Sequence, residues 1–364
     1  MLYIIHLDRS LIIVLVLCFS LVAKSQQDFS KHISANAYYG FIFAHNKDVE
    51  NTAGSKPFGL SLELSKLKFD SASYNTARCY PKTGINFIYF NYDNAILGHS
   101  LTCAYFIEPS FLLSKLIMFA PRGSLGLSYL TNPHHSVHNP GNNSYSLTIS
   151  VFLQLGLSIQ YRITSKTALL FSASYLHVSN GGLKIPNRGI NWPAASLGLS
   201  YRMNSAEFQR QKYSPAKRFN AHNKVEFGVY SSVKTLEDHE GKVFPVPGFC
   251  LSYYRRINNL HSVGIIADVH EDQSLAAQQK KRNESTHSVF PSLAIGHEYL
   301  LGKINFWQQI GYYVVAPDER FINWYHRWGL SYNLTKQLNI GVGIKAHAHV
   351  AHFADLRFAY NLIY

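Results

Sequence analysis

The stretch SYSLTISVFLQLGLSIQYR, residues 144–162, alternates apolar and polar side chains along almost its whole length. On a β-strand, residues two apart share a face, so Tyr145, Leu155 and Tyr161 would lie together on an apolar face. Strands in soluble sheets usually run about five or six residues, whereas a tilted transmembrane strand needs about ten. The stretch therefore predicts one strand of a transmembrane β-barrel, with its tyrosines in the two aromatic girdles. The alternative is a long hairpin in a soluble secreted β-protein.

Similar alternation recurs along the chain and predicts an all-β, antiparallel barrel of about sixteen strands. The predicted strands lie near 32–45, 57–67, 83–91, 97–108, 114–130, 144–162, 167–179, 193–204, 223–234, 246–256, 261–270, 287–300, 303–313, 323–333, 337–347 and 352–364.

The two halves of the chain, 26–204 and 223–364, look weakly alike. A basic stretch, 205–222, joins them and carries Arg210, Lys212, Lys217 and Arg218. We interpret it as a periplasmic connection inside one large barrel, since only the second half ends the chain; two tandem eight-stranded barrels are the alternative. Long outer loops and short inner turns support the strand count. The exceptions are 68–82 and 205–222, which are long where short turns are expected.

Both ends of the chain point to the outer membrane of a Gram-negative bacterium. Residues 1–25 resemble a cleaved signal peptide, with an apolar core at 11–22 that is too short for a convincing membrane helix. The last predicted strand ends in the aromatic Tyr364 and looks like the signal read by the barrel assembly machinery. The net charge of +13 suggests an anionic partner. For an exported protein, the phosphates of an outer-membrane lipid fit that charge better than nucleic acid does.

A second stretch, YLHVSNGGLKIPNRGIN at 175–191, carries the chemistry. His177 and Ser179 would lie side by side at the end of an apolar strand face, and a base beside a hydroxyl is the start of a nucleophilic site. The loop that follows offers amide donors at Asn180 and Asn187. Backbone N–H groups could also approach a developing oxyanion at Gly181 and Gly182.

The pattern His-x-Ser-Asn-x-Gly followed by Pro-Asn-x-Gly resembles the outer-membrane lipid A 3-O-deacylase (PagL-like) family, over residues 31–204. The resemblance implies an eight-stranded unit with its active site on the barrel exterior, near the outer leaflet. It implies His177 as general base, Ser179 as nucleophile, and Asn187 with N–H groups near Gly181 as the oxyanion site. The implied substrate is an ester-linked acyl chain of lipid A in lipopolysaccharide. The second half, 223–364, has no counterpart of this motif.

One position departs from the family. Its third catalytic residue is a Glu fourteen residues after the His, where this chain has Asn191, and no Asp or Glu occurs from 109 to 206. An Asn can orient a histidine through its carbonyl oxygen, as in Cys-His-Asn proteases, but it cannot stabilise an imidazolium by charge. We therefore expect activity that is reduced or absent. Glu63 or Glu108 on a neighbouring strand could substitute.

Weaker features complete the prediction. Lys184 and Arg188 flank the motif and could bind lipid phosphates. Two groups of histidines could bind a metal, His134, His135 and His138 in one and His347, His349 and His352 in the other. They lack a Cys or carboxylate at fixed spacing, so we predict neither a metal site nor a cofactor. The chain is thus expected to be an outer-membrane serine esterase acting on lipid A or a related lipid. The rival is a non-catalytic barrel, porin-like or structural, that keeps a decayed esterase motif.

Overall fold

The computed structural model describes residues 28–204, 208, 210–212, 221–236, 242–315, 322–348 and 350–363. The predicted signal peptide, 1–25, and Tyr364 lie outside these residues. In chain order the elements are β1 (Phe29–Gly40), η1 (Lys47–Thr52), β2 (Phe58–Lys68), α2 (Ser71–Ala77), β3 (Tyr80–Asn91), β4 (His99–Leu112), β5 (Ile117–Leu130), β6 (Ile149–Arg162), β7 (Thr167–Ser179), β8 (Ile190–Arg202), β9 (Asn223–Thr235), β10 (Val243–Arg256), β11 (His261–Glu271), α3 (Gln273–Lys281), β12 (Val289–Leu301), β13 (Ile304–Tyr313), β14 (Trp324–Asn333), β15 (Leu338–His347) and β16 (Val350–Ile363).

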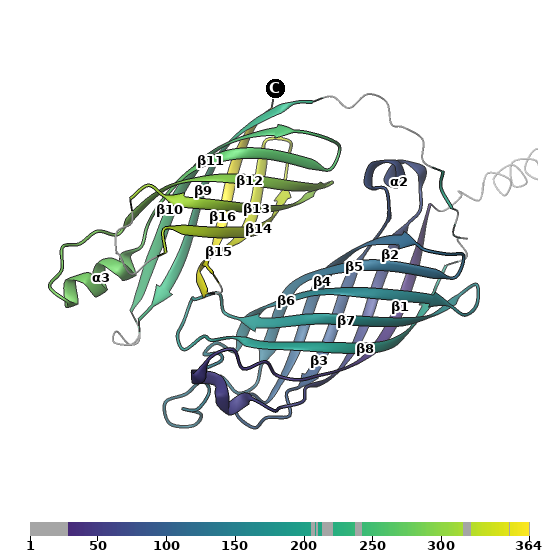
Figure 1. Cartoon of the computed structure of the whole chain (residues 1–364), viewed down its shortest axis with the longest axis horizontal. Helices are drawn as coiled ribbons and strands as arrows, with labels where there is room; N and C mark the ends of the chain where they lie inside the picture. The colour runs from purple at the N-terminus through teal and green to yellow at the C-terminus, as the bar shows by residue number, and fades with distance from the viewer. Residues whose placement is uncertain are drawn as a thin grey trace, which may run out of the picture.

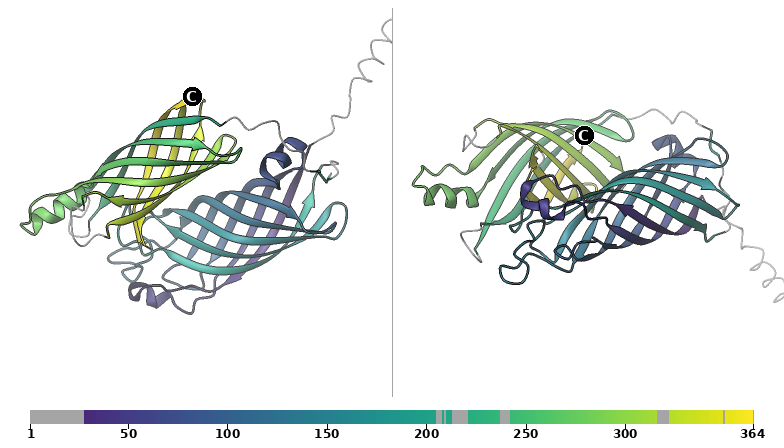
Figure 2. Two further views of the ribbon diagram at one scale, coloured as in Figure 1. Left: turned by 45° about the horizontal axis from the view of Figure 1, so that its top comes forward. Right: turned by 60° about the horizontal axis from the view of Figure 1, so that its bottom comes forward.

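The sixteen strands among the described residues form two closed antiparallel barrels (Figures 1 and 2). Strands β1 to β8 close through the pairing of β1 with β8, and β9 to β16 close through the pairing of β16 with β9. The predicted all-β class and strand number are confirmed, and the arrangement is the alternative of two tandem eight-stranded barrels. The single large barrel that we favoured is wrong, because each half satisfies its own edge strands by pairing them with each other.

The two long inner connections now have explanations. The connection from β2 to β3 contains α2, and 205–222 is the join between two barrels rather than a turn within one. Part of this join returns to the first barrel. The ring of Phe208 packs on Tyr80, with ring centroids 4.7 Å apart, and on Phe69 at 5.8 Å. Gln211 donates its side-chain amide to the carbonyl oxygen of Phe69. An aromatic cluster that includes Phe208 therefore lies at this end of the first barrel.

The strand that opened the sequence analysis is shorter than predicted. Strand β6 begins at Ile149, and 144–148 belong to the preceding loop. The Asn142 side chain accepts hydrogen bonds from the N–H groups of Ser144 and Tyr145 and so turns the chain. Tyr145 is fully buried and donates to the carbonyl oxygen of Leu97, so it is not a girdle residue. Burial raises the pKa of the Tyr145 hydroxyl, which stays a neutral donor.

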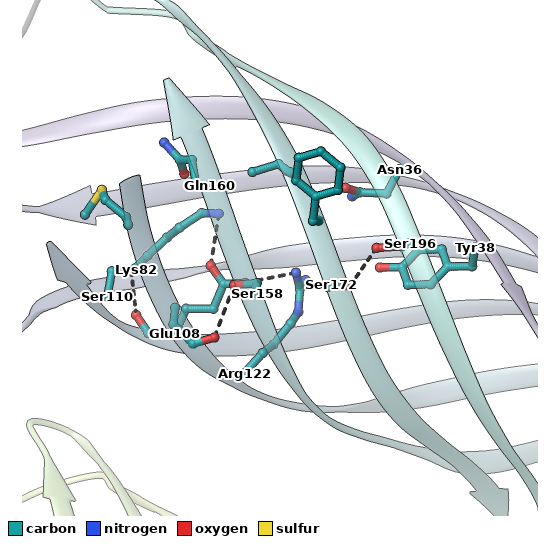
Figure 3. A pocket seen from close by; sticks show the side chains of 14 residues that line it. Asn36, Tyr38, Lys82, Glu108, Ser110, Arg122, Ser158, Gln160, Ser172 and Ser196 are labelled. Carbon is teal, nitrogen blue, oxygen red and sulfur yellow. Dashed lines mark hydrogen bonds and ion pairs between the residues drawn. The ribbon is translucent and has the colours of Figure 1, made fainter. Parts of the chain in front are cut away.

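Paired charges fill the first barrel (Figure 3). Arg122 contacts Glu63 at 2.7 Å and Glu108 at 3.1 Å, and Lys82 lies 3.0 Å from the second oxygen of Glu108. The second barrel holds a similar network, formed by Glu226, Asp268, Arg327, Lys345 and Arg357 with their partners. An eight-stranded barrel is just wide enough for side chains to fill its interior. The interiors are thus packed polar cores.

The outward faces are apolar. On β6 the exterior carries Leu155, Leu157 and Ile159, each about half exposed, and the same alternation continues around both barrels. A continuous apolar exterior with polar side chains inside is the pattern of a membrane barrel. Among the described residues, no helix has the length and apolar character to cross a membrane.

Candidate active site

Strand β7 has the bounds predicted for it and presents His177 on the exterior of the first barrel. Its outward residues Phe171 and Tyr175 are 47% and 46% exposed, while Leu176 and Val178 point inward and are fully buried. His177 and Ser179 continue the outward series, as the alternation predicts. The two side chains therefore lie where the apolar exterior of β7 ends.

The structure brings together the three residues predicted to be catalytic. The Nε2 atom of His177 lies 2.8 Å from the Oγ of Ser179, and its Nδ1 atom lies 2.6 Å from the Oδ1 of Asn191. Asn191 faces His177 directly across the β7–β8 ladder. Side chains of such cross-strand pairs have Cβ atoms about 4.5–5.5 Å apart, close enough to hydrogen-bond. The β7–β8 hairpin thus brings His177 and Asn191 into contact although they are fourteen residues apart in the sequence.

A second histidine lies on the other side of the Asn191 amide. The Nδ2 of Asn191 lies 2.9 Å from the Nδ1 of His45. An amide nitrogen only donates, so His45 accepts through Nδ1, and the amide oxygen is left facing His177. His177 then donates through Nδ1 and can accept the Ser179 proton at Nε2. This is the tautomer that a general base needs.

His45 was not predicted from the sequence. The chain beyond β1 keeps running along β8, where the N–H of Phe43 donates to the carbonyl oxygen of Asn191 at 2.8 Å. Phe41 and Phe43 face outward, being 55% and 53% exposed, and His45 continues their series. The alternation was visible in the sequence. The contact was not, because β1 meets β8 only on closure of the barrel.

Gly189 lies against the ring of His177. A Cβ atom at this position would sit 2.7 Å from Cε1 of the histidine, and Gly189 has a φ of +76°. Both the space and the backbone conformation therefore call for glycine. This glycine belongs to the Pro-Asn-x-Gly part of the motif, and it lets the loop backbone approach the His177 ring closely.

The loop after Ser179 is held by its own side chains. The N–H of Asn180 donates to Oδ1 of Asn187 at 2.9 Å, and the N–H of Gly182 donates to Oδ1 of Asn180 at 3.1 Å. The side-chain amide of Asn180 donates to the carbonyl oxygen of Lys184 at 2.6 Å. Two of the predicted oxyanion donors are therefore used inside the loop. The N–H of Gly181 and the NH₂ of Asn187 are donors that no hydrogen bond between described residues uses.

The flanking cations differ from each other. Arg188 binds Asp48 through Nε at 2.9 Å and through Nη2 at 2.7 Å, and both side chains are about half exposed. Lys184 is exposed and contributes its carbonyl oxygen to the loop. Lys184 thus presents a positive charge beside the site, whereas Arg188 is ion-paired with Asp48.

Neither of the proposed replacement carboxylates reaches His177. Glu63 and Glu108 are buried and pair with Arg122 inside the barrel, whereas His177 faces outward. The expectation that one of them could substitute for the missing Glu is wrong, since it requires a side chain on the other face of its strand.

The two histidine groups have other contacts. His135 accepts from the N–H groups of Val137 and His138, which organises the outer loop. His352 contacts Asp272 at 3.1 Å, and His349 lies outside the described residues. Within the part of the chain that the structure describes, no three His, Cys, Asp or Glu residues are grouped as a metal site requires.

Both halves of the chain match family models. Residues 66–204 match the family described as lipid A 3-O-deacylase (PagL), and residues 223–364 match the one described as acyloxyacyl hydrolase, C-terminal domain. A search of curated proteins finds no match.

Among solved structures, the outer membrane enzyme PagL is 18% identical and covers 45% of this chain and 97% of its own, with a TM-score of 0.32. Neisserial surface protein A is 12% identical and covers 48% of this chain and 99% of its own, with a TM-score of 0.34. The N-terminal β-barrel domain of Pseudomonas aeruginosa OprF is 11% identical over 48% of this chain and 99% of its own, with a TM-score of 0.29.

Proposed function

The chain belongs to the PagL family, since residues 66–204 match the lipid A 3-O-deacylase model and residues 223–364 match the acyloxyacyl hydrolase C-terminal model. We propose that it is an outer-membrane serine esterase. Its proposed reaction is hydrolysis of an ester-linked acyl chain of lipid A or a related lipid. The observation that carries the proposal is the continuous hydrogen-bonded line from Ser179 through His177 to Asn191.

In the first half of the proposed reaction, Ser179 is acylated. His177 takes the Ser179 proton at Nε2 while Oγ attacks the carbonyl carbon of the ester, and the carbonyl electron pair moves onto oxygen. Collapse of this intermediate breaks the ester C–O bond. The leaving alkoxide takes the proton back from Nε2, and the acyl chain stays on Ser179.

In the second half, water attacks the acyl-enzyme. His177 again accepts a proton at Nε2, the Ser179–acyl bond breaks, and the proton returns to Oγ as the free fatty acid leaves. Throughout both halves the Nδ1 proton stays on His177, donated to the oxygen of Asn191. The amide holds the tautomer but supplies no negative charge opposite the imidazolium, so the proposed enzyme is slower than one with a carboxylate at this position.

The oxyanion of each intermediate needs donors aimed at the attacked carbonyl. The N–H of Gly181 and the NH₂ of Asn187 are the candidates, since the N–H groups of Asn180 and Gly182 are engaged within the loop. Lys184 is a candidate contact for a lipid phosphate. The position of the site suits a lipid substrate, since it lies where the apolar exterior of β7 ends and a membrane ester could meet Ser179 without leaving the bilayer.

The proposal is tested with purified full-length protein folded in detergent micelles and mixed with lipid A. We expect mass spectrometry to show loss of an ester-linked acyl chain and release of the matching fatty acid. Ser179→Ala should abolish release while keeping the fold. Intact lipid A after incubation with folded wild-type protein would favour the rival, a non-catalytic barrel that keeps the motif.

A further inference from the structure

The two barrels meet at the loop after Ser179. The N–H of Ala354, on β16 of the second barrel, donates to the carbonyl oxygen of Gly181 at 2.9 Å. Figures 1 and 2 show the end of the β15–β16 hairpin, in yellow, beside the loops at the end of the teal strands β6 and β7. A backbone bond thus joins the second barrel to the residue that carries a candidate oxyanion donor.

The start of β16 is open on the side that faces this loop. β16 pairs with β15 from Val350 onward, but its pairing with β9 begins only at Leu356, opposite Ser231. The β16–β9 ladder among the described residues therefore stops two residues short of Ala354. On this edge the carbonyl oxygen of Ala354 accepts from the hydroxyl of Ser232, and its N–H donates to Gly181. An open edge is a template for pairing with another segment, and the catalytic loop occupies this one.

The fit between the two segments is close. A Cβ atom on Gly181 would lie 2.6 Å from the Cβ of Ala354, and one on Gly182 would lie 3.3 Å from the carbonyl oxygen of His352. Both glycines have positive φ, +66° and +84°. A Gly-Gly pair is the most flexible dipeptide a loop can contain, so the contact with Ala354 adds to the loop's own hydrogen bonds in restricting its conformation.

We propose that the second barrel is a positioning element for the esterase site. Ala354 holds Gly181 so that its N–H stays aimed at the oxyanion of the acyl intermediate. This inference rests on the proposed function and assigns a role to a domain that carries no catalytic motif of its own. Ala354 is a positioning residue, because it acts through Gly181.

The direct test removes the N–H of Ala354. Ala354→Pro deletes the donor on the open edge and leaves the bonds to β15, which use the other edge. Ala354→Gly is the matched control, because it keeps the N–H and loses only the methyl group. For the proline variant we expect kcat to fall about 10- to 100-fold with KM within about twofold, since loss of a whole oxyanion donor costs about 10²–10³. The glycine control should keep kcat within about threefold.

A second variant and a second measurement cover the case in which Ala354→Pro fails to fold. Ser232→Ala removes the hydroxyl that holds Ala354 from the β9 side, and it should lower kcat about two- to tenfold. Hydrogen exchange followed by mass spectrometry should show a protected Ala354 amide in the wild-type protein. The same measurement should show faster exchange at 180–183 in the variants.

The outcomes separate this inference from the proposed function. If wild-type protein is active and Ser179→Ala is inactive, but folded Ala354→Pro keeps the wild-type kcat, the second barrel does not position the site. An unprotected Ala354 amide in the wild type, or full activity in Ser232→Ala despite faster loop exchange, would also overturn the inference. If wild-type and Ser179→Ala proteins release the same amount of fatty acid, the proposed function itself fails.

Discussion

Asn191 lies directly opposite His177 on neighbouring strands, and its side-chain oxygen is 2.6 Å from Nδ1 of the histidine. In the proposed reaction this amide orients His177 through its oxygen but adds no negative charge beside the ring.

Changing Asn191 should separate orientation from charge. Asn191→Leu leaves the Nδ1 proton without its acceptor, so we expect kcat to fall by about 10²- to 10⁴-fold, given that an acid-to-amide change in the Ser-His-Asp template costs about 10⁴. Asn191→Glu adds charge stabilisation of the imidazolium and should raise kcat. Release of fatty acid under saturating substrate is the measurement. Unchanged turnover with leucine at 191 would mean that the site works as a Ser-His dyad.

His45 should matter only while residue 191 is an amide. His45→Ala removes the acceptor that fixes the amide orientation, a hydrogen bond worth about 0.5–1.5 kcal/mol. We therefore expect kcat to fall about two- to tenfold. A carboxylate presents an oxygen in either orientation, so the same change made together with Asn191→Glu should have little effect. Equal losses in the two backgrounds would show that His45 acts in some other way.

Gly189→Ala should disable the base by displacing it. The new methyl group would lie 2.7 Å from the His177 ring at a positive φ, and a misplacement of about 1 Å can cost about 10² in rate. Gly54→Ala is the matched control, since Gly54 has a φ of +82° and no atom within 4 Å of the added Cβ. We expect kcat to fall steeply in the first variant and to be retained in the control. Equal activities would mean that Gly189 serves only the loop conformation.

The apolar exteriors of both barrels predict recovery with the outer membrane. Membrane fractionation should place the protein there, and folded protein should migrate faster on a gel than boiled protein. Recovery as a soluble periplasmic species would contradict the membrane assignment.

The alternation of apolar and polar residues predicted most of the strands. The alternation of Leu169, Phe171, Ala173 and Tyr175 predicted both the bounds of β7 and the outward position of His177, because the side-chain period of a strand is fixed at two. The start of β6 was predicted five residues too early, at 144 instead of Ile149. The apolar pattern continues through 144–148, but side-chain hydrogen bonds from Asn142 turn the chain there.

Long-range closure could not be read from the sequence. The strand that pairs with β8 could be β1, which closes an eight-stranded barrel, or β9, which continues a larger one. The alternation of apolar and polar residues along each strand is the same in both cases, so it cannot decide between them. For that reason the barrel number and His45, which reaches the site only through the β1–β8 seam, were missed. The contact between Ala354 and Gly181 joins the two barrels and has no local signal either.

The most direct test of the central claim is mass spectrometry of lipid A from Gram-negative cells that express the wild-type protein, the Ser179→Ala variant or neither. The account predicts lipid A lighter by one ester-linked acyl chain only in cells with the wild-type protein. Identical lipid A in all three strains, with both proteins folded in the outer membrane, would contradict it.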